Sequence, residues 1–145
     1  MSSKACILVV EDNRSLIRVY KRLLQKEGYK VLTAFDGLEG LQKAQERKPN
    51  LIILDVMMPE MDGYSVCRRL KRNPDTAAIP VLMLTRKGSL VGPGNLAAER
   101  RYCDPIRERM TGFDAGALGF LSKPVPAKEL LARVRSLLWF GGFTE

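Results

Sequence analysis

LIILD at residues 51–55, followed by VMMPEMDG at residues 56–63, is the stretch that decides the fold. Four consecutive apolar residues stand between Pro49-Asn50 and a turn cluster of Pro, Asp and Gly, which predicts a strand buried on both faces of a parallel sheet. Ligands bind at the carboxyl ends of such strands, so Asp55 would stand where a ligand is bound. An aspartate here can also cap the next helix or open the turn, and this stretch alone leaves both interpretations open.

Strand and helix patterns alternate along the rest of the chain. Short apolar runs predict strands at residues 5–10, 30–34, 51–54, 80–84 and 117–121. Helical spacing of apolar residues predicts helices at residues 14–26, 37–47, 63–72 and 126–139. The expected apolar faces of the first two helices are Leu16, Ile17, Tyr20, Leu23 and Leu24, and Leu38, Leu41 and Ala44.

This alternation is typical of an α/β fold with a doubly wound parallel sheet between two layers of helices. Five strands favour the flavodoxin-like (βα)5 arrangement with strand order 2-1-3-4-5. The chain then reverses direction between the first and third strands, so the carboxyl ends of these two strands line the ligand crevice. Glu11 and Asp12 follow the first strand and Asp55 ends the third, which predicts that the three carboxylates meet.

Length and composition limit the number of domains, the cellular location and the kinds of catalysis that can be expected of this chain. A chain of 145 residues is expected to form one domain, residues 1–140, with residues 141–145 as a tail or the start of a linker. No apolar run is long enough to span a membrane and no signal peptide precedes the first strand, so we expect a cytoplasmic protein. The absence of histidine excludes Ser-His-Asp and Cys-His catalysis within the chain. The three cysteines follow no metal-ligand spacing, and Cys6 and Cys67 are expected in the core, with Cys103 exposed.

The net charge of +8 is concentrated in the second half of the chain. Residues 63–145 carry 14 basic and 7 acidic side chains. A basic half can contact an acidic partner, but Lys and Arg on solvated helix faces explain the charge equally well. The sequence has no basic stripe interleaved with aromatic residues and no helix-turn-helix pattern, so direct binding of DNA by this domain is not expected.

Three carboxylates in one crevice repel one another unless a cation neutralises them. Oxygen ligands in small number favour Mg²⁺, which usually shares its coordination shell with a phosphoryl oxygen. Thr85 after the fourth strand and Lys123 after the fifth would add a hydroxyl and an ammonium, and this set can bind a phosphoryl group on one carboxylate. Glu11 and Asp12 can also cap the first helix, with or without Asn13, and this role can coexist with metal binding.

Taken in order, these motifs resemble the response-regulator receiver domain (CheY-like), the phospho-accepting module of two-component signalling. The matching stretches are VVEDN at 9–13, LDVMMP at 54–59 with DG at 62–63, LT at 84–85, and GFDAGA at 112–117 with FLSKP at 120–124. They cover nearly the whole chain.

The resemblance implies a role for each matching residue. Asp55 would accept the phosphoryl group, and Lys123 and Thr85 would contact it. Asp12, Glu11, Asp55 and the backbone carbonyl of Met57 would hold Mg²⁺. Phe120 would change rotamer as Thr85 moves, and the Lys123-Pro124 peptide would be cis.

The same resemblance implies a switch rather than an enzyme that acts on other molecules. A histidine kinase or a histidine phosphotransfer protein would supply the phosphoryl group, because the chain has no histidine of its own. Phosphorylation would alter the face formed by the fourth helix, the fifth strand and the last helix, which would contact a downstream protein or fused output domain, or a second copy in a homodimer.

The chain departs from the family after Thr85. Thr85 and Lys123 are 123 − 85 = 38 residues apart, whereas a loop, a helix, a second loop and a strand need roughly 20 to 25. We interpret residues 86–104 as an insertion, with a short helix at 95–101 and the fourth helix beginning at Asp104-Pro105. It is either a surface loop without function or a contact for a partner, and Arg86 either shields a phosphoryl group or points to solvent.

Two other functions remain as alternatives at this stage. One is an interaction scaffold of the same fold that works without phosphorylation, a pseudo-receiver. The other is a phosphohydrolase, for which a second acid two residues after the nucleophile is expected; this chain has Met57 there.

Overall fold

The computed structural model of this chain describes residues 4–58, 61–86 and 116–143. The elements follow one another in alternating order. They are β1 (Cys6–Val10), α1 (Arg14–Lys26), β2 (Lys30–Ala34), α2 (Gly37–Arg47), β3 (Leu51–Asp55), α3 (Gly63–Arg72), β4 (Val81–Arg86), β5 (Gly119–Lys123) and α6 (Ala127–Phe140).

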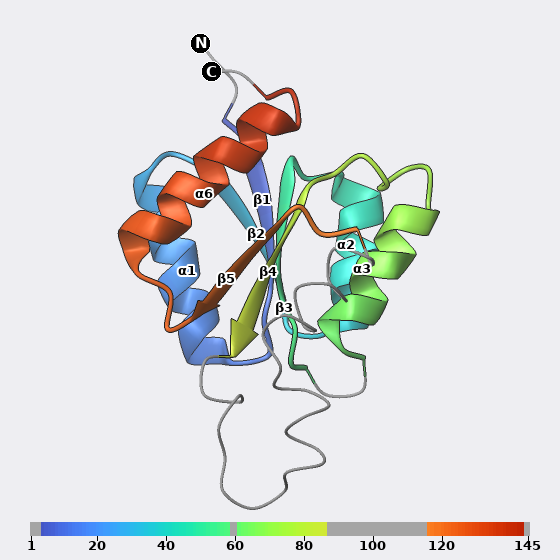
Figure 1. Cartoon of the computed structure of the whole chain (residues 1–145), viewed down its shortest axis with the longest axis horizontal. Helices are drawn as coiled ribbons and strands as arrows, with labels where there is room; N and C mark the ends of the chain where they lie inside the picture. The colour runs from blue at the N-terminus through green and yellow to red at the C-terminus, as the bar shows by residue number, and fades with distance from the viewer. Residues whose placement is uncertain (1–3, 59–60, 87–115, 144–145) are drawn as a thin grey trace, which may run out of the picture.

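The five strands form one parallel sheet in the order β2-β1-β3-β4-β5, which confirms the predicted topology. Helices α1 and α6 cover one face of the sheet, and α2 and α3 cover the other (Figure 1). No helix within the described ranges is long and apolar enough to cross a membrane. The strand order brings the carboxyl ends of β1 and β3 next to each other, as the predicted ligand crevice requires.

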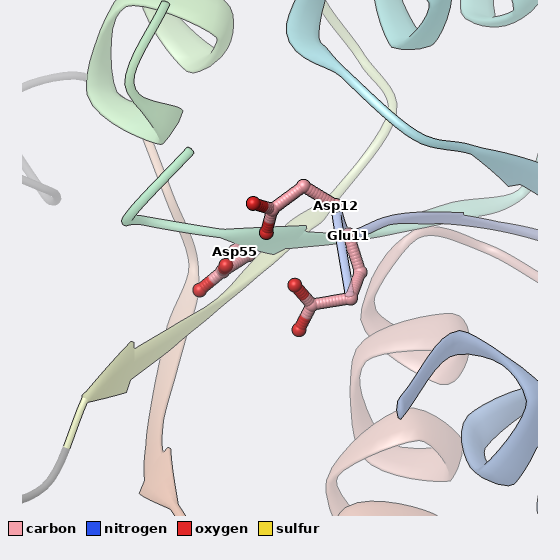
Figure 2. Close-up of side chains that lie close together, drawn as sticks. All are labelled: Glu11, Asp12 and Asp55. Atoms are coloured by element: carbon pink, nitrogen blue, oxygen red, sulfur yellow. The ribbon is translucent and has the colours of Figure 1, made fainter. Parts of the chain in front are cut away.

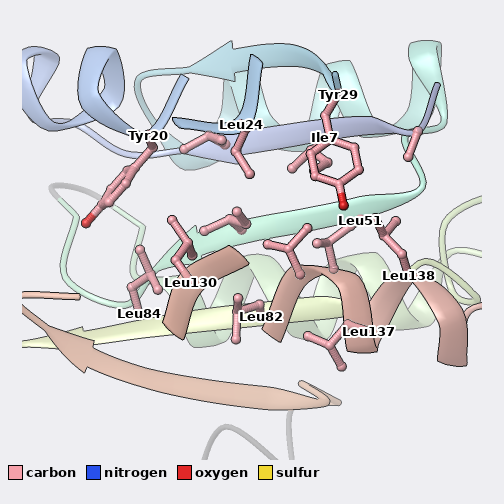
Figure 3. Close-up of a cluster of buried hydrophobic side chains, with 14 of the residues drawn as sticks. Ile7, Tyr20, Leu24, Tyr29, Leu51, Leu82, Leu84, Leu130, Leu137 and Leu138 are labelled. Carbon is pink, nitrogen blue, oxygen red and sulfur yellow. The ribbon is translucent and has the colours of Figure 1, made fainter. Parts of the chain in front are cut away.

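Two apolar layers hold the helices to the sheet. Strand β3 is buried along its whole length, because helices lie against both of its faces. In β1 the side chains alternate, so that Ile7 and Val9 enter the layer with α1 and α6, whereas Leu8 and Val10 enter the layer with α2 and α3. Figure 3 shows the first of these layers.

Polar caps fix the places where two helices begin, both at the carboxyl edge of the sheet. Helix α1 begins after Asn13, whose side-chain oxygen accepts hydrogen bonds from the backbone N–H groups of Ser15 and Leu16. Helix α3 begins after Asp62, which accepts from the N–H of Ser65 at 2.9 Å. The alternative in which Glu11 and Asp12 cap α1 is therefore not what the structure has, and both acids are left for another role.

Gly63 lets α3 approach the end of β3 closely. A Cβ atom at Gly63 would lie 2.4 Å from the carbonyl oxygen of Asp55 and 2.9 Å from the Cα of Val56. The Gly63 N–H donates to the carbonyl oxygen of Val56 at 2.9 Å. Only glycine fits this approach, so the Asp-Gly pair of the turn holds the backbone on either side of Asp55.

Some predicted boundaries and burials were wrong. Strand β5 occupies Gly119–Lys123 rather than 117–121, because its register with β4 begins at Gly119 opposite Leu82. Strand β4 extends to Arg86, and α6 lies one residue further along the chain than expected. Leu38 was expected on the buried face of α2 but is 59% exposed. Ala44 is buried and Leu41 partly buried as expected. Gly37 and Gly40 take the place of Leu38 on the buried face, since these small residues let α2 pack closely on Val10 and Val66.

The prediction of buried cysteines is correct for one of the two cysteines that the structure describes. Cys67 is buried as expected, whereas Cys6, the first residue of β1, is partly exposed. Cys103, the helices predicted at 95–101 and from Asp104, and nearly all of the 86–104 insertion lie outside the described residues, as does the side chain of Arg86.

Candidate functional site

The end of β3 and the loop after β1 bring three carboxylates together. One oxygen from each of Glu11, Asp12 and Asp55 lies within 4.8 Å of the others. Figure 2 shows Asp55 at the end of β3 and the other two acids in the loop after β1, with the carboxylates gathered in one region. Glu11 is 1% and Asp55 3% exposed, whereas Asp12 is exposed. The predicted convergence of these carboxylates is therefore present.

Lys123 supplies the positive charge that this cluster needs. Its Nζ atom lies 2.6 Å from Oε1 of Glu11 and 3.1 Å from Oδ1 of Asp55. The other oxygen of Glu11 accepts a hydrogen bond from the backbone N–H of Asn13 at 3.2 Å. Lys123 reaches the site from the end of β5, and the peptide bond that follows it, Lys123-Pro124, is cis, as the resemblance implied.

The charges at the site shift two pKa values upward. Burial of its carboxylate raises the pKa of Asp12, and both a hydrogen bond with Glu11 and the negative charge of Glu11 raise it further. Burial opposes the charge of Lys123, but the hydrogen bond to Glu11 and the charges of Asp55 and Glu11 outweigh it and raise the pKa of Lys123. Lys123 is thus an ammonium at neutral pH, while the three acids still exceed it in charge.

The donor set fits Mg²⁺. Three carboxylates converge with one ammonium between two of them, so the cluster carries net negative charge and offers oxygen ligands alone. Hard divalent cations prefer such ligands, and Mg²⁺ is commonly held by only one or two carboxylates. Lys123 and the Asn13 N–H already engage Glu11, so Asp12 and Asp55 are the better placed direct ligands, and Glu11 is held beside them.

These residues line a pocket of about 480 Å³. Its polar end contains the three acids, Asn13 and Lys123, and Met57 lies in its wall with 39% of its surface exposed. Its other wall is apolar and comes from α1 and from the chain after β5. The pocket thus joins an acidic, cation-binding end to an apolar end.

Thr85 and Phe120 are not among the residues that line this pocket. The Thr85 hydroxyl is buried and faces β5, at 3.4 Å from the carbonyl oxygen of Leu121 and 3.5 Å from Oγ of Ser122. Thr85 stands one residue beyond Leu84, the partner of Asp55 in the sheet. Phe120 is partly buried in the apolar layer with α2 and α3. Both lie on strands near Asp55, and among the described residues the Thr85 hydroxyl makes its contacts with β5 rather than with Asp55.

Sequence patterns did not indicate that two further residues belong to the site. Tyr20 lines the pocket, although its helical spacing placed it among the core residues of α1. The sequence pattern predicts only a capping role for Asn13, yet its backbone N–H also donates a hydrogen bond to the Glu11 carboxylate. A cap that directly follows two acids could have indicated this second role.

Comparison with known proteins identifies the family. The family model described as "Response regulator receiver domain" matches residues 7–93. The chain belongs to this family. The matched segment includes the acid pair, Asp55 and Thr85.

Curated relatives of this receiver domain are response regulators. The chain is 40% identical over 132 residues to the "DNA-binding dual master transcriptional regulator RpaA" of Synechocystis, covering 91% of this chain and 48% of the relative. It is 43% identical over 136 residues to the "Response regulator PleD" of Caulobacter vibrioides, covering 94% of this chain and 26% of the relative. This receiver domain therefore spans half or less of the length of these relatives.

Solved structures of similar fold include response regulators and receiver domains. A putative response regulator from Chloroflexus aurantiacus has a TM-score of 0.80 and 32% identity, over 94% of this chain and 99% of that one. The chemotaxis protein CheY4 of Vibrio cholerae has a TM-score of 0.77 and 30% identity, over 93% and 99%. The receiver domain of the sensor histidine kinase PA1611 from Pseudomonas aeruginosa has a TM-score of 0.73 and 25% identity, over 94% and 98%, and holds a magnesium ion in its active site cleft.

Proposed function

We propose that this receiver domain is a Mg²⁺-dependent phospho-accepting switch in which Asp55 receives a phosphoryl group. The observation that carries the proposal is the position of Lys123, between Glu11 and Asp55 at 2.6 and 3.1 Å, beside the exposed carboxylate of Asp12. An ammonium and a cation site on either side of one carboxylate are what a phosphoryl group on that carboxylate requires. Membership of the family supports the same role.

Different residues of the chain would bind the cation, accept the phosphoryl group and contact its oxygens. Asp12 and Asp55, with Glu11 and the Met57 backbone carbonyl, would hold Mg²⁺, which when bound neutralises charge on the phosphoryl oxygens. An oxygen of Asp55 forms the new bond to phosphorus while the donor's bond to phosphorus breaks and the donor keeps the electron pair. Lys123, already 3.1 Å from Asp55, then contacts a phosphoryl oxygen.

Thr85 would transmit the effect of phosphorylation at Asp55 to strands β4 and β5. Phosphorylation adds about −1.5 to −2 charge and strong acceptor oxygens. The contacts of the Thr85 hydroxyl at 3.4 and 3.5 Å are longer than good O–H···O hydrogen bonds, so little is lost when the hydroxyl turns toward a phosphoryl oxygen. Movement of Thr85 would then change the packing of Phe120 and the output face formed by the fourth helix, β5 and α6.

The donor and the target of the switch are part of the proposal. A histidine kinase or histidine phosphotransfer protein would supply the phosphoryl group, since the chain has no histidine. The output face would contact a downstream protein, a fused output domain or a second copy of the chain. The greater length of the response regulator relatives supports a fused domain, and we place this switch in the cytoplasm.

Acetyl phosphate and Mg²⁺ test the proposal by intact mass. One phosphate is expected on the wild-type chain, and none is expected on Asp55→Asn or after removal of Mg²⁺ with a chelator. Asp55→Asn is a close control because the amide keeps the size of the side chain. An unlabelled wild type would favour the scaffold that works without phosphorylation. Rapid release of phosphate without an adduct on Asp55 would favour a phosphohydrolase.

A further inference from the structure

The strands begin at the edge of the sheet opposite Asp55, which we call the amino edge. All strands of the sheet are parallel, so their first residues meet there, namely Cys6, Lys30, Leu51, Val81 and Gly119. The helices run back along the strands and end at the same edge, as Figure 1 shows for α6. The phosphoryl-accepting site makes no use of this edge, because it lies at the other end of the strands.

Two exposed aromatic side chains occupy the α6 end of the amino edge. Trp139 is 70% and Phe140 75% exposed, and their rings contact each other edge to face, with 6.4 Å between the ring centroids. The chain after them lies against the beginning of β4, since a Cβ atom at Gly141 would be 3.2 Å from Cγ of Pro80. Leu118, just before β5, is 55% exposed. Large apolar side chains are therefore presented to solvent where β4 and β5 begin.

The rest of the amino edge is basic. The Lys30 N–H donates to the carbonyl oxygen of Ala5, which joins the beginnings of β1 and β2. Burial raises the pKa of the Cys6 thiol there, and the nearby positive charges of Arg47 and Lys30 act against this rise. The exposed basic residues of this edge include Lys4, Lys26, Lys30, Arg47, Lys48 and Arg72, against the exposed acids Glu27, Glu46 and Asp75.

Helix stability explains only part of this pattern. Basic residues in the last turn of a helix complement its dipole, which accounts for Lys26, Arg47 and Arg72. It does not account for Lys4 and Lys30, or for the exposed aromatic pair in the last turn of α6, which has no basic residue. Aromatic rings next to basic side chains suit the surface of an anionic bilayer, because the rings enter the headgroup layer and the negative surface potential attracts Lys and Arg.

We propose that the amino edge binds the surface of a membrane that contains anionic lipids, with the rings of Trp139 and Phe140 among the headgroups. Neighbouring strands lie about 4.8 Å apart, so the edge is roughly 20 Å wide and its aromatic and basic parts can contact one bilayer together. A second copy of the chain would bring two basic edges together, which repel each other. A DNA duplex would engage the basic side chains but bury little of the aromatic pair.

This orientation leaves the carboxyl edge of the sheet directed away from the bilayer. A phosphoryl donor in solution could therefore still reach Asp55 in the membrane-bound chain. The inference goes beyond the proposed function and does not depend on phosphorylation.

The fluorescence of Trp139 reports directly on this surface, because it is the only tryptophan of the chain. The full chain is titrated with vesicles of phosphatidylcholine alone or of phosphatidylcholine and phosphatidylglycerol in equal parts. The mixed vesicles should shift the emission to shorter wavelength and should sediment with the chain. High salt should release the chain, because it screens the attraction between the basic side chains and the lipid. Vesicles of phosphatidylcholine alone should have little effect.

Paired variants separate the amino edge from positive charge in general. Arg47→Gln with Lys48→Gln should lower the affinity for the mixed vesicles about 25-fold, since each basic residue near an anionic surface contributes about fivefold. Arg18→Gln with Lys128→Gln removes the same charge from exposed positions in the parts of α1 and α6 that lie nearer the carboxyl edge. This control pair should lower the affinity less than about twofold, because its charges lie beyond the reach of the surface potential.

Phe140→Ala tests the aromatic part and keeps the Trp139 fluorophore. It should weaken binding to the mixed vesicles about tenfold through the loss of buried apolar surface. Leu38→Ala is the matched control, because Leu38 is 59% exposed and lies in the first turn of α2, at the carboxyl edge. It should leave the affinity unchanged.

Absence of binding, equal binding to both kinds of vesicle, or equal losses in the edge and control variants would overturn the inference. A shift of the emission without vesicles that grows with protein concentration would assign the aromatic pair to a second copy of the chain instead. Binding of a DNA duplex without binding of vesicles, lost in Arg47→Gln with Lys48→Gln, would assign the edge to nucleic acid and also overturn the inference. Each of these outcomes would leave the proposed role of Asp55 intact.

Discussion

The carboxyl edge of the sheet and the apolar layer under α1 and α6 adjoin each other but are built in opposite ways. The layer contains aliphatic and aromatic side chains from β1, β3, β4 and both helices, nearly all buried. The edge gathers three carboxylates and one ammonium within a few ångströms. In the layer, apolar side chains pack against one another and need no further partner. At the edge, three carboxylates face one ammonium, which leaves an excess of negative charge that a bound cation would neutralise.

This difference separates the source of stability from the source of function. Burial of apolar surface is the main favourable term in folding, so the layer should determine the free energy of unfolding. Like charges held together lower stability and raise affinity for a ligand of opposite charge, so the edge should determine binding and phosphoryl transfer. Substitutions that affect one region and spare the other test this separation.

Leu130→Ala should have the largest effect on stability. Leu130 is fully buried in α6 against the sheet. Loss of its side chain leaves a cavity and is expected to lower the free energy of unfolding by about 2–5 kcal/mol. Denaturant unfolding measures this loss, and Mg²⁺-dependent labelling of Asp55 by acetyl phosphate should stay near the wild-type rate while the variant is folded.

Trp139→Ala provides the matched control in the same helix. Trp139 is 70% exposed, so its removal should change stability by less than about 0.5 kcal/mol. If Leu130→Ala slowed labelling of the folded protein as strongly as it lowered stability, the layer and the edge would not be separate in function.

The order of elements and the acidic site could be predicted because each depends on a strong local pattern. The alternation of apolar runs and amphipathic segments determined the parallel sheet and its order, and the acids at two strand ends then had to meet. Lys123 was placed correctly for the same reason, since it ends a strand on the far side of β4. Such predictions need only the direction of each strand.

The predictions that failed needed side-chain packing. The run around Leu121 is apolar on both sides, so it could not fix where β5 begins. Leu38 looked like a core residue, but α2 packs through Gly37 and Gly40, which carry no hydrophobic signal. Helical spacing correctly predicted that Tyr20 is buried, but it could not show that Tyr20 also lines the pocket, because that depends on how α1 lies against the site.

Cys67 tests whether the second apolar layer, under α2 and α3, excludes charge. Burial raises the pKa of the Cys67 thiol to about 11, whereas the unfolded value is 9.0. A raised pKa gives stability that is present below the unfolded value and is lost as the pH rises toward the folded value, because only the unfolded chain then releases the proton. Between about pH 8 and about pH 10.5 the wild type should therefore lose about 2 kcal/mol more stability than Cys67→Ala.

Denaturant unfolding at several pH values measures this difference, and only the change with pH is compared, since the substitution also removes packing at neutral pH. Cys6 is the graded control: burial raises its pKa too, but it is partly exposed. Cys6→Ala should remove a smaller part of the alkaline loss. Parallel curves for the wild type and Cys67→Ala would mean that the thiol ionises in the folded protein.

Asp12→Asn should change stability much less than Leu130→Ala does, and it should stabilise the folded chain rather than destabilise it. Because burial and Glu11 raise the pKa of Asp12, its stabilising contribution is present only when it is protonated and is lost as the pH rises through its folded pKa. At pH 7 the ionised carboxylate is therefore unfavourable, and the amide should raise Tm by about 1–2 °C, a small gain because Asp12 is exposed. The gain should shrink as the pH is lowered toward the pKa of Asp12.

With Mg²⁺ present, the wild type should have a higher Tm than Asp12→Asn, the reverse of the order expected without the cation. A ligand that binds only the folded chain stabilises it in proportion to the logarithm of its concentration over Kd, so Mg²⁺ should raise the Tm of the wild type. Asp12→Asn lacks one carboxylate of the cluster and should gain much less. Asp75→Asn, which removes an exposed acid away from the cluster, should gain as much as the wild type. Equal gains for Asp12→Asn and the wild type would show that the edge binds the cation without Asp12, and the excess charge there would need another explanation.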